Sequence, residues 1–267
     1  MSSPDAKGIL SDRQLREGIE ISIPLYFNGL QPNAYGAELA TARPLQAENF
    51  IASVSRGGYL NCEQYSLTTH CNGTHTESIA HLLSDAIPIC DVLGLDLTFN
   101  AKLISVTPET TTVEHYLPTI EADDRLITRQ QLEDALNSEA TTSALIIRTQ
   151  PNDQTKCSRN YSIQAAPFFT NEAMQFIVER KVRHLLVDLP SVDRAADQGL
   201  LSNHRIFWNV LPGVRELTSG ERRDATITEM VYVPESIKDG NYLVAIQIPH
   251  FKTDAAPSRI ILYPSLP

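Results

Sequence analysis

Residues 70–81 read HCNGTHTESIAH and form the most unusual stretch of the chain. The protein has 267 residues and only 7 histidines, yet His70, His75 and His81 all fall within this window. Even spacing would put about 0.3 of a histidine into twelve residues. The stretch is therefore the first candidate for a site of chemistry.

Four potential ligands in this stretch alternate so that they would share one face of an extended chain. Cys71, His75, Glu77 and His81 supply the side-chain types that bind zinc: thiolate, imidazole and carboxylate. A straight strand of this length would measure about 33 Å, so the chain must bend for one ion to draw all four together. Gly73 can adopt positive φ, and a helical turn would bring Glu77 beside His81. His75 and Glu77 are the pair best placed to bind an ion together.

Each of these residues, taken alone, also fits a purely structural role. A lone buried cysteine is usually a small core side chain, and a lone His or Glu is usually exposed or hydrogen-bonded. His70 has the opposite parity, and we expect it to be such a residue. The group of four favours a site, because burying these groups unpaired would be costly. A thiol nucleophile on Cys71 with His75 or His81 as its base is an alternative without special geometric support.

Composition and charge limit the classes of protein to which the chain can belong. The chain is 42% hydrophobic and 20% charged, with a formal net charge of −10, which is typical of a globular protein and disfavours nucleic acid or an anionic membrane as a partner. No apolar run approaches the roughly 20 residues that span a bilayer, and no secretory signal is visible. The four cysteines include no C-x-x-C pair and fit a reducing compartment. We expect a cytoplasmic protein that acts on a small molecule.

Hydrophobic patterning predicts one sheet-rich domain over residues 1–267, since no linker or repeat divides the chain. One helix begins at Thr128, where Gln131 completes a capping box, and another follows Thr170. Alternating helices and strands predict α/β packing in the middle third, and roughly the last 40 residues predict an antiparallel meander. The expected strands are Ile19–Leu25, Phe50–Val54, Gln64–Thr69, Lys102–Val106, Ala144–Thr149, His184–Asp188, Thr226–Val233, Tyr242–Pro249 and Arg259–Tyr263.

The stretch 71–81 resembles the motif H-x-G-T-H-x-D-x-P-x-H of the cyclase family of metal-dependent hydrolases, which includes bacterial-type kynurenine formamidase and isatin hydrolase. Cys71, Glu77 and Ile79 stand where the family has His, Asp and Pro. Both ligand changes keep metal-binding chemistry. The resemblance continues along the chain. Residues 19–25 resemble the family's first strand and residues 144–149 its central strand, and residues 187–193 resemble its D-x-x-S-x-D turn and residues 257–262 its last strand.

The resemblance implies an α/β fold of the swivelling β/β/α type, one or two divalent ions, and assembly as a homodimer or homotetramer. It also implies that His81 moves a proton as general base and then acid, and that Glu229 takes part in catalysis or anchors the ion. Residues 207–224 have the character of an insertion before Glu229. Zinc is the expected ion, with manganese as the alternative. The implied metal ligands are Cys71, His75, Glu77, His204 and Glu229.

These expectations describe a metal-dependent hydrolase that cleaves a small amide, formamide or lactam, in the manner of an arylformamidase acting on C–N bonds other than peptide bonds. A cyclase or dehydratase on the same scaffold and a non-catalytic metal-binding protein remain alternatives. Asp188 and Asp193 around Ser191 are either catalytic or part of a turn that caps a helix. The aromatic residues that could line a substrate pocket are Tyr26, Tyr35, Tyr59, Phe168, Phe169 and Trp208.

Overall fold

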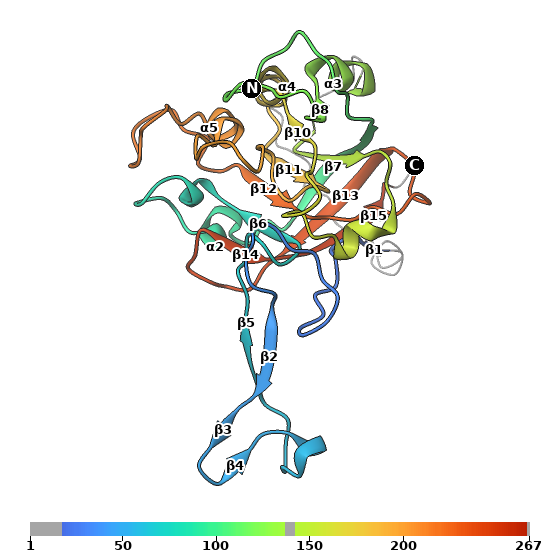
Figure 1. Cartoon of the computed structure of the whole chain (residues 1–267). Coiled ribbons are helices and arrows are strands. Elements are labelled where there is room, and N and C mark those ends of the chain that lie inside the picture. The colour runs from blue at the N-terminus through green and yellow to red at the C-terminus, as the bar shows by residue number, and fades with distance from the viewer. Residues whose placement is uncertain (1–17, 137–141, 266–267) are drawn as a thin grey trace.

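A mixed nine-stranded sheet dominates the computed structural model, which describes residues 18–136 and 142–265 (Figure 1). Its order is β1-β15-β13-β7-β9-β11-β12-β6-β14. The strands β7, β9, β11 and β12 run parallel, and the flanking strands are antiparallel to their neighbours. This confirms the predicted α/β class. The bounds are β1 (Ile19–Glu20), β6 (His75–Glu77), β7 (Thr98–Val106), β9 (Ala144–Thr149), β11 (His184–Val187), β12 (Thr226–Glu229), β13 (Gly240–Gln247), β14 (Ala255–Pro257) and β15 (Arg259–Pro264).

Both predicted helices begin where their capping residues indicated. The Gln131 side chain accepts from the Thr128 N–H at 3.1 Å, and Thr128 Oγ1 accepts from the Gln131 N–H at 3.4 Å. Thr170 Oγ1 accepts from the Ala173 N–H at 3.1 Å. Each bond satisfies an N–H group that the first turn leaves without an intrahelical partner. The helices are α2 (Ile89–Leu93), α3 (Arg129–Leu136), α4 (Asn171–Glu179) and α5 (Ser202–Trp208), with 3-10 turns η1 (Val54–Arg56), η2 (Ile79–His81) and η3 (Gln154–Ser158).

Strand β9 shows why the centre of the sheet forms. All of its residues are buried, which agrees with the apolar run of its first four residues, 144–147. Leu145 and Ile147 belong to a core cluster that includes residues of α3 and α4, whereas Ala144 and Ile146 belong to the core cluster on the other face. Alternate side chains thus anchor the two faces of the sheet. Among the described residues, no helix is long and apolar enough to cross a membrane.

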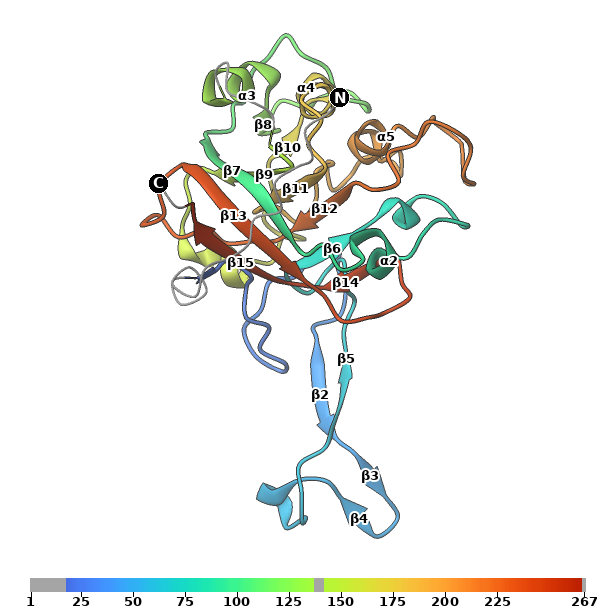
Figure 2. The same ribbon diagram turned by 180° about the vertical axis from the view of Figure 1, so that it is seen from behind.

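Residues 41–66, which we call the arm, project away from the sheet on the side opposite α3 and α4 (Figures 1 and 2). Two short ribbons build the arm, and the expected strands Phe50–Val54 and Gln64–Thr69 lie within or next to it, outside the main sheet. All residues of β5 are exposed. The strands of the arm are β2 (Thr41–Pro44), β3 (Gln46–Ala47), β4 (Phe50–Ile51) and β5 (Glu63–Ser66).

The C-terminal region departs from the expected meander. β13 and β15 are antiparallel neighbours, but β14 leaves them and pairs with β6 at the far edge of the sheet. The strand expected over Thr226–Val233 ends at Glu229, because Met230 has φ of 55° and leaves the extended conformation. Phe207 and Trp208, the first residues of the segment interpreted as an insertion, are buried residues of α5.

Candidate metal centre

Three of the predicted ligands lie on one face where β6 pairs with β12. His75 and Glu77 alternate on β6, and Glu229 is the residue directly opposite His75 on β12. His75 Nε2 lies 3.4 Å from Glu229 Oε2. His75 and Glu77 are fully buried, so neither has water to solvate it. The β-strand alternation expected from the sequence therefore brings these groups together.

The fourth ligand, His204, comes from the first turn of α5. Its Nε2 lies 3.1 Å from Glu77 Oε1 and 3.8 Å from Glu229 Oε1. Asp193 Oδ2 accepts a hydrogen bond from His204 Nδ1 at 2.6 Å and from the His204 backbone N–H at 3.1 Å. Asp193 Oδ1 accepts from the Asn203 N–H at 2.9 Å. The turn around Asp193 therefore caps α5, which is one of the two roles considered from the sequence, and Asp193 also orients the His204 ring. We call His75, Glu77, His204 and Glu229 the inner cluster.

The hydrogen bonds around the inner cluster fit a divalent cation. His75 Nδ1 donates to the Gly73 carbonyl at 3.0 Å, so in the neutral ring Nε2 carries the lone pair. The same holds for His204, whose Nδ1 donates to Asp193: its neutral ring also has the lone pair on Nε2. Metal-bound histidines usually donate their other N–H to a carboxylate or carbonyl in this way. His75 Nε2 is buried without a hydrogen bond, and the two buried Glu77 oxygens face only the ring nitrogens of His204 and His70, each at 3.1 Å. A cation between them would satisfy all three atoms.

A second group of ligand atoms lies on the other side of Glu77. His70 Nδ1 is 3.1 Å from Glu77 Oε2, and His70 Nε2 is 2.8 Å from Asp254 Oδ2. His81 Nδ1 lies 3.8 Å from Glu77 Oε2 and 3.6 Å from Asp254 Oδ2. The 3-10 turn η2 brings His81 back to Glu77, as expected for a helical turn after Glu77. We call His70, Glu77, His81 and Asp254 the outer cluster.

Sequence reasoning missed His70 and Asp254. The chain turns at residues 68–73, where the Cys71 N–H bonds the Thr68 carbonyl and Gly73 has φ of 124°, so strand alternation does not apply to His70. The histidine density of the window was the signal that could have included it. Asp254 precedes β14, which pairs with β6, and no motif marks it.

Strong electrostatic coupling links the two clusters. Burial alone would raise the pKa of Glu77, but His81 and His204 hold it well below its usual value. Burial would lower the pKa of His204, but Glu77 and Asp193 raise it well above 6.5. Burial would also lower the pKa of His70, but the hydrogen bonds that its ring donates to Asp254 and Glu77 raise it to about 10. Imidazolium protons thus balance these carboxylates, and a cation would compete with those protons.

Cys71 lies outside both groups of ligand atoms, although it stands at the motif position of the first histidine. The side chain is buried, and burial together with the negative charge of Glu229 raises the pKa of its thiol. The thiol is therefore protonated at neutral pH unless a cation draws the sulfur in.

A cavity of about 310 Å³ opens over the centre. Its wall includes groups from both clusters, so a small molecule in the cavity would contact them directly. The cavity is lined in part by Tyr35, His81, Pro190, Asp193, Arg194 and Glu229.

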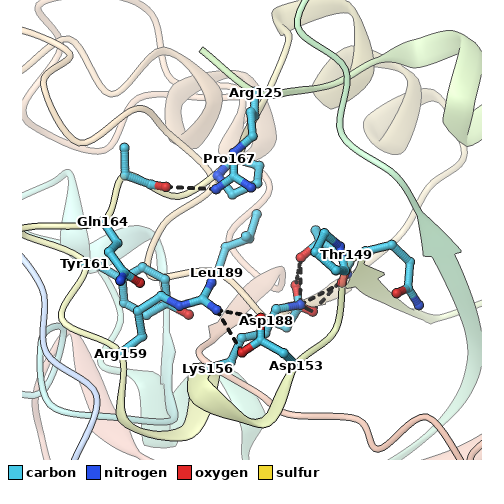
Figure 3. A pocket seen from close by; sticks show the side chains of 13 residues that line it. Arg125, Thr149, Asp153, Lys156, Arg159, Tyr161, Gln164, Pro167, Asp188 and Leu189 are labelled. Carbon is cyan, nitrogen blue, oxygen red and sulfur yellow. Dashed lines mark hydrogen bonds and ion pairs between the residues drawn. The ribbon is translucent and has the colours of Figure 1, made fainter. Parts of the chain in front are cut away.

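Asp188 belongs to a separate cavity (Figure 3). Its Oδ2 accepts from Lys156 Nζ at 2.7 Å and from the Thr149 N–H at 2.8 Å. Lys156 Nζ also donates to the Thr149 carbonyl at 2.6 Å. These bonds tie the ends of β9 and β11 together, which assigns Asp188 a structural role.

The fold and the inner cluster together define an α/β protein with a candidate divalent-cation centre. Residues 18–194 match the family model described as putative cyclase, and the chain belongs to this Cyclase family. No curated protein is significantly similar in sequence to this chain.

Solved structures share the fold at low sequence identity. A predicted metal-dependent hydrolase from Bacillus stearothermophilus is 14% identical over 92% of this chain and 97% of its own, with a TM-score of 0.59. A potential metal-dependent hydrolase with cyclase activity is 14% identical over 94% and 98%, with a TM-score of 0.62. Isatin hydrolase A from Labrenzia aggregata, bound to benzyl benzoate, is 12% identical over 93% and 94%, with a TM-score of 0.61.

Proposed function

We propose that the protein is a metal-dependent hydrolase that cleaves a small amide, formamide or lactam at a C–N bond. The inner cluster carries the proposal, because it places buried imidazole and carboxylate ligand atoms, among them the unpaired Nε2 of His75, beside a cavity large enough for a small molecule. Membership of the Cyclase family and the fold shared with proteins described as metal-dependent hydrolases and an isatin hydrolase support it.

His75, Glu77, His204 and Glu229 would hold the ion, with Cys71 as a further proposed ligand. Mixed imidazole, carboxylate and thiol donors favour zinc, with manganese as the alternative. A divalent ion bound by these residues lowers the pKa of a water molecule and polarises the substrate carbonyl. Glu77 faces both clusters, so the centre has room for one or two ions.

His81 is the proposed proton carrier. Its Nδ1 faces the carboxylates of Glu77 and Asp254, which leaves Nε2 for the cavity. The side chain is 25% exposed, so it can reach water and substrate. We assign His81 the removal of a proton from the attacking water and its delivery to the departing amine nitrogen. The two carboxylates hold the ring in the orientation that this transfer requires.

The test combines metal content with turnover. Protein purified without added metal is analysed for bound elements and assayed with N-formylkynurenine, isatin, formanilide and a simple aryl ester. We expect His75→Gln to lose the metal, and His81→Gln to keep the metal but lose turnover. His115→Gln is the matched control, since His115 is exposed and bonds Glu172. Absence of metal binding even on titration, or full activity of His81→Gln, would contradict the proposal. Metal binding without hydrolysis would favour a cyclase, a dehydratase or a non-catalytic protein.

We also propose a reducing, cytoplasmic setting and self-association through the arm. All four cysteines are free, which supports the first point. The arm supports the second, because the segment that joins its ribbons exposes the apolar side chains of Val54 and Tyr59, and two-stranded ribbons are marginally stable alone. A second copy of the chain, which carries an identical arm, is the proposed partner.

A further inference from the structure

A second cavity, which we call the side pocket, adjoins the cavity over the metal centre. Its volume is about 270 Å³. The two cavities share one wall, and a molecule placed at the metal centre would reach the side pocket by passing along it. The residues common to both are Tyr35, Pro190, Asp193, Arg194 and Ala195.

The floor of the side pocket is apolar and partly aromatic. Ala34 and Phe168 are each 1% exposed, and Tyr161 is also buried. Tyr35 adds a second tyrosine at the entrance. Pockets that hold whole ligands run from roughly 300 to 1,000 Å³, so this volume suits one substituted aromatic ring, which is part of a ligand.

The rim of the side pocket is acidic. Glu121, Asp123 and Asp124 line it, and Arg194 is its only cationic lining residue among those described. Arg194 is shared by two carboxylates, with Nη2 2.5 Å from Glu121 Oε2 and Nε 3.2 Å from Asp124 Oδ1. Asp123 is exposed and makes no described ion pair. The three carboxylates and one guanidinium that line the rim therefore have a net charge of −2.

Two further guanidinium groups border the side pocket, because Ala165 and Tyr161 line both it and the neighbouring cavity. Arg125 follows the acidic segment, but it lines the neighbouring cavity, where its Nη2 donates to the Ala165 carbonyl at 3.0 Å (Figure 3). Arg159 lies in the same neighbouring cavity and donates to Asp153 at 2.9 Å. Arg159 also lies 5.8 Å over the Tyr161 ring, but its charge is balanced by Asp153, whereas Arg125 offsets one carboxylate of the acidic segment. One negative charge therefore remains at the rim, and we assign it to Asp123, which makes no described ion pair.

We propose that the side pocket selects the substrate, by binding an aromatic group that carries a cationic or uncharged substituent and by rejecting one that carries a carboxylate. The inference deepens the proposed hydrolase function and rests on it for the position of the reacting bond. Aromatic faces and uncompensated carboxylates both attract a cation and repel an anion. At an intermediate effective dielectric constant of about 40, one unit charge about 6 Å from another changes affinity about tenfold.

The test compares three formanilides whose para substituent is separated from the ring by a methylene, so that intrinsic reactivity is matched. The substituents are trimethylammonium, its uncharged isostere tert-butyl, and carboxylate. We expect kcat/KM to be about tenfold higher for the cation than for the uncharged compound, and lower again for the carboxylate. Asp123→Asn should remove most of the advantage that the cation has over the tert-butyl substrate. Glu48→Gln on the arm makes the same charge change far from the pocket and should alter none of the rates.

A binding measurement separates failure of the pocket from failure of the hydrolase. Calorimetric titration with benzyltrimethylammonium should give binding that Asp123→Asn weakens several-fold and Glu48→Gln does not. If no formanilide is hydrolysed but this binding is seen, the side pocket stands and the hydrolase proposal fails. If the formanilides are hydrolysed without charge preference, or Asp123→Asn affects all three alike, the inference about the side pocket is overturned.

Discussion

Replacing Asp193 by Asn tests whether the metal centre depends on the residue that orients His204. The Asp193 carboxylate accepts four hydrogen bonds: from Tyr116 Oη at 2.8 Å, the Asn203 N–H at 2.9 Å, the His204 N–H at 3.1 Å and His204 Nδ1 at 2.6 Å. Asparagine has the same shape but only one acceptor oxygen. If that oxygen stays with His204, its NH2 group must face the donor at Asn203.

Two costs follow from this geometry. Leaving a buried backbone N–H without an acceptor lowers the free energy of unfolding by about 1–3 kcal/mol. Removing the negative charge behind His204 Nδ1 weakens the ring as a ligand, and such changes typically reduce metal affinity about 10- to 100-fold, or about 1.4–2.7 kcal/mol. Asp193→Asn should therefore be somewhat less stable and bind zinc markedly more weakly.

Competition with a chromophoric chelator measures zinc affinity, and circular dichroism confirms that each variant is folded at the assay temperature. Asp188→Asn is the matched control. Asp188 is equally buried, accepts bonds from Thr149 and Lys156, and touches neither cluster. It should lose stability, since Lys156 loses its partner, but keep its zinc affinity. The reasoning fails if folded Asp193→Asn binds zinc as tightly as the parent protein, or if Asp188→Asn weakens zinc binding equally.

Three further predictions concern the thiol, the pH dependence of stability and the arm. Cys71→Ala should lower zinc affinity in the same competition assay; unchanged affinity would make Cys71 a packing residue. The pKa of His184 is lowered to about 3 by burial and by the positive charges of Arg183 and Arg222, so the unfolded chain binds this proton near pH 6.5 and the folded chain does not. The free energy of unfolding should fall as the pH drops below about 6.5, by about 2 kcal/mol from this group at pH 5, and His184→Gln should lack that part of the fall in urea titrations at the two pH values. Light scattering should show a dimer or tetramer that Tyr59→Ser weakens, because Tyr59 is 98% exposed on the arm; a parent protein that is monomeric at all concentrations would contradict this.

The parts of the fold that were predictable from sequence are those specified by local signals. The apolar run of β9 is buried on both faces, and the side chains of Thr128 and Thr170 cap the helices that follow them. The pairing of β14 with β6 joins three-residue segments far apart in the chain, and its short strands carry no pattern that specifies the partner. Long-range pairing of this kind depends on the packing of the whole sheet, which a window of sequence does not contain.

The candidate site also has a part that local sequence rules predict and a part that they do not. Strand alternation and the turn after Glu77 placed His75, Glu77 and His81 correctly relative to one another, because those rules act over a few residues. Only resemblance to a family connected His204 and Glu229 with them. Asp254 arrives through β14, so predicting its place would have required the long-range pairing as well.

The departures from the family motif are linked by the geometry of Glu77. Its side chain is one methylene longer than the Asp of the motif and reaches about 1.5 Å farther. Its two oxygens face different partners, with Oε1 3.1 Å from His204 Nε2 and Oε2 3.1 Å from His70 Nδ1. The motif's first histidine is replaced by Cys71, and an imidazole stands one position earlier instead, where the turn at residues 68–73 directs it to Oε2. The longer carboxylate of Glu77 therefore bridges the inner and outer clusters, and His70 supplies an imidazole next to the motif position that Cys71 occupies.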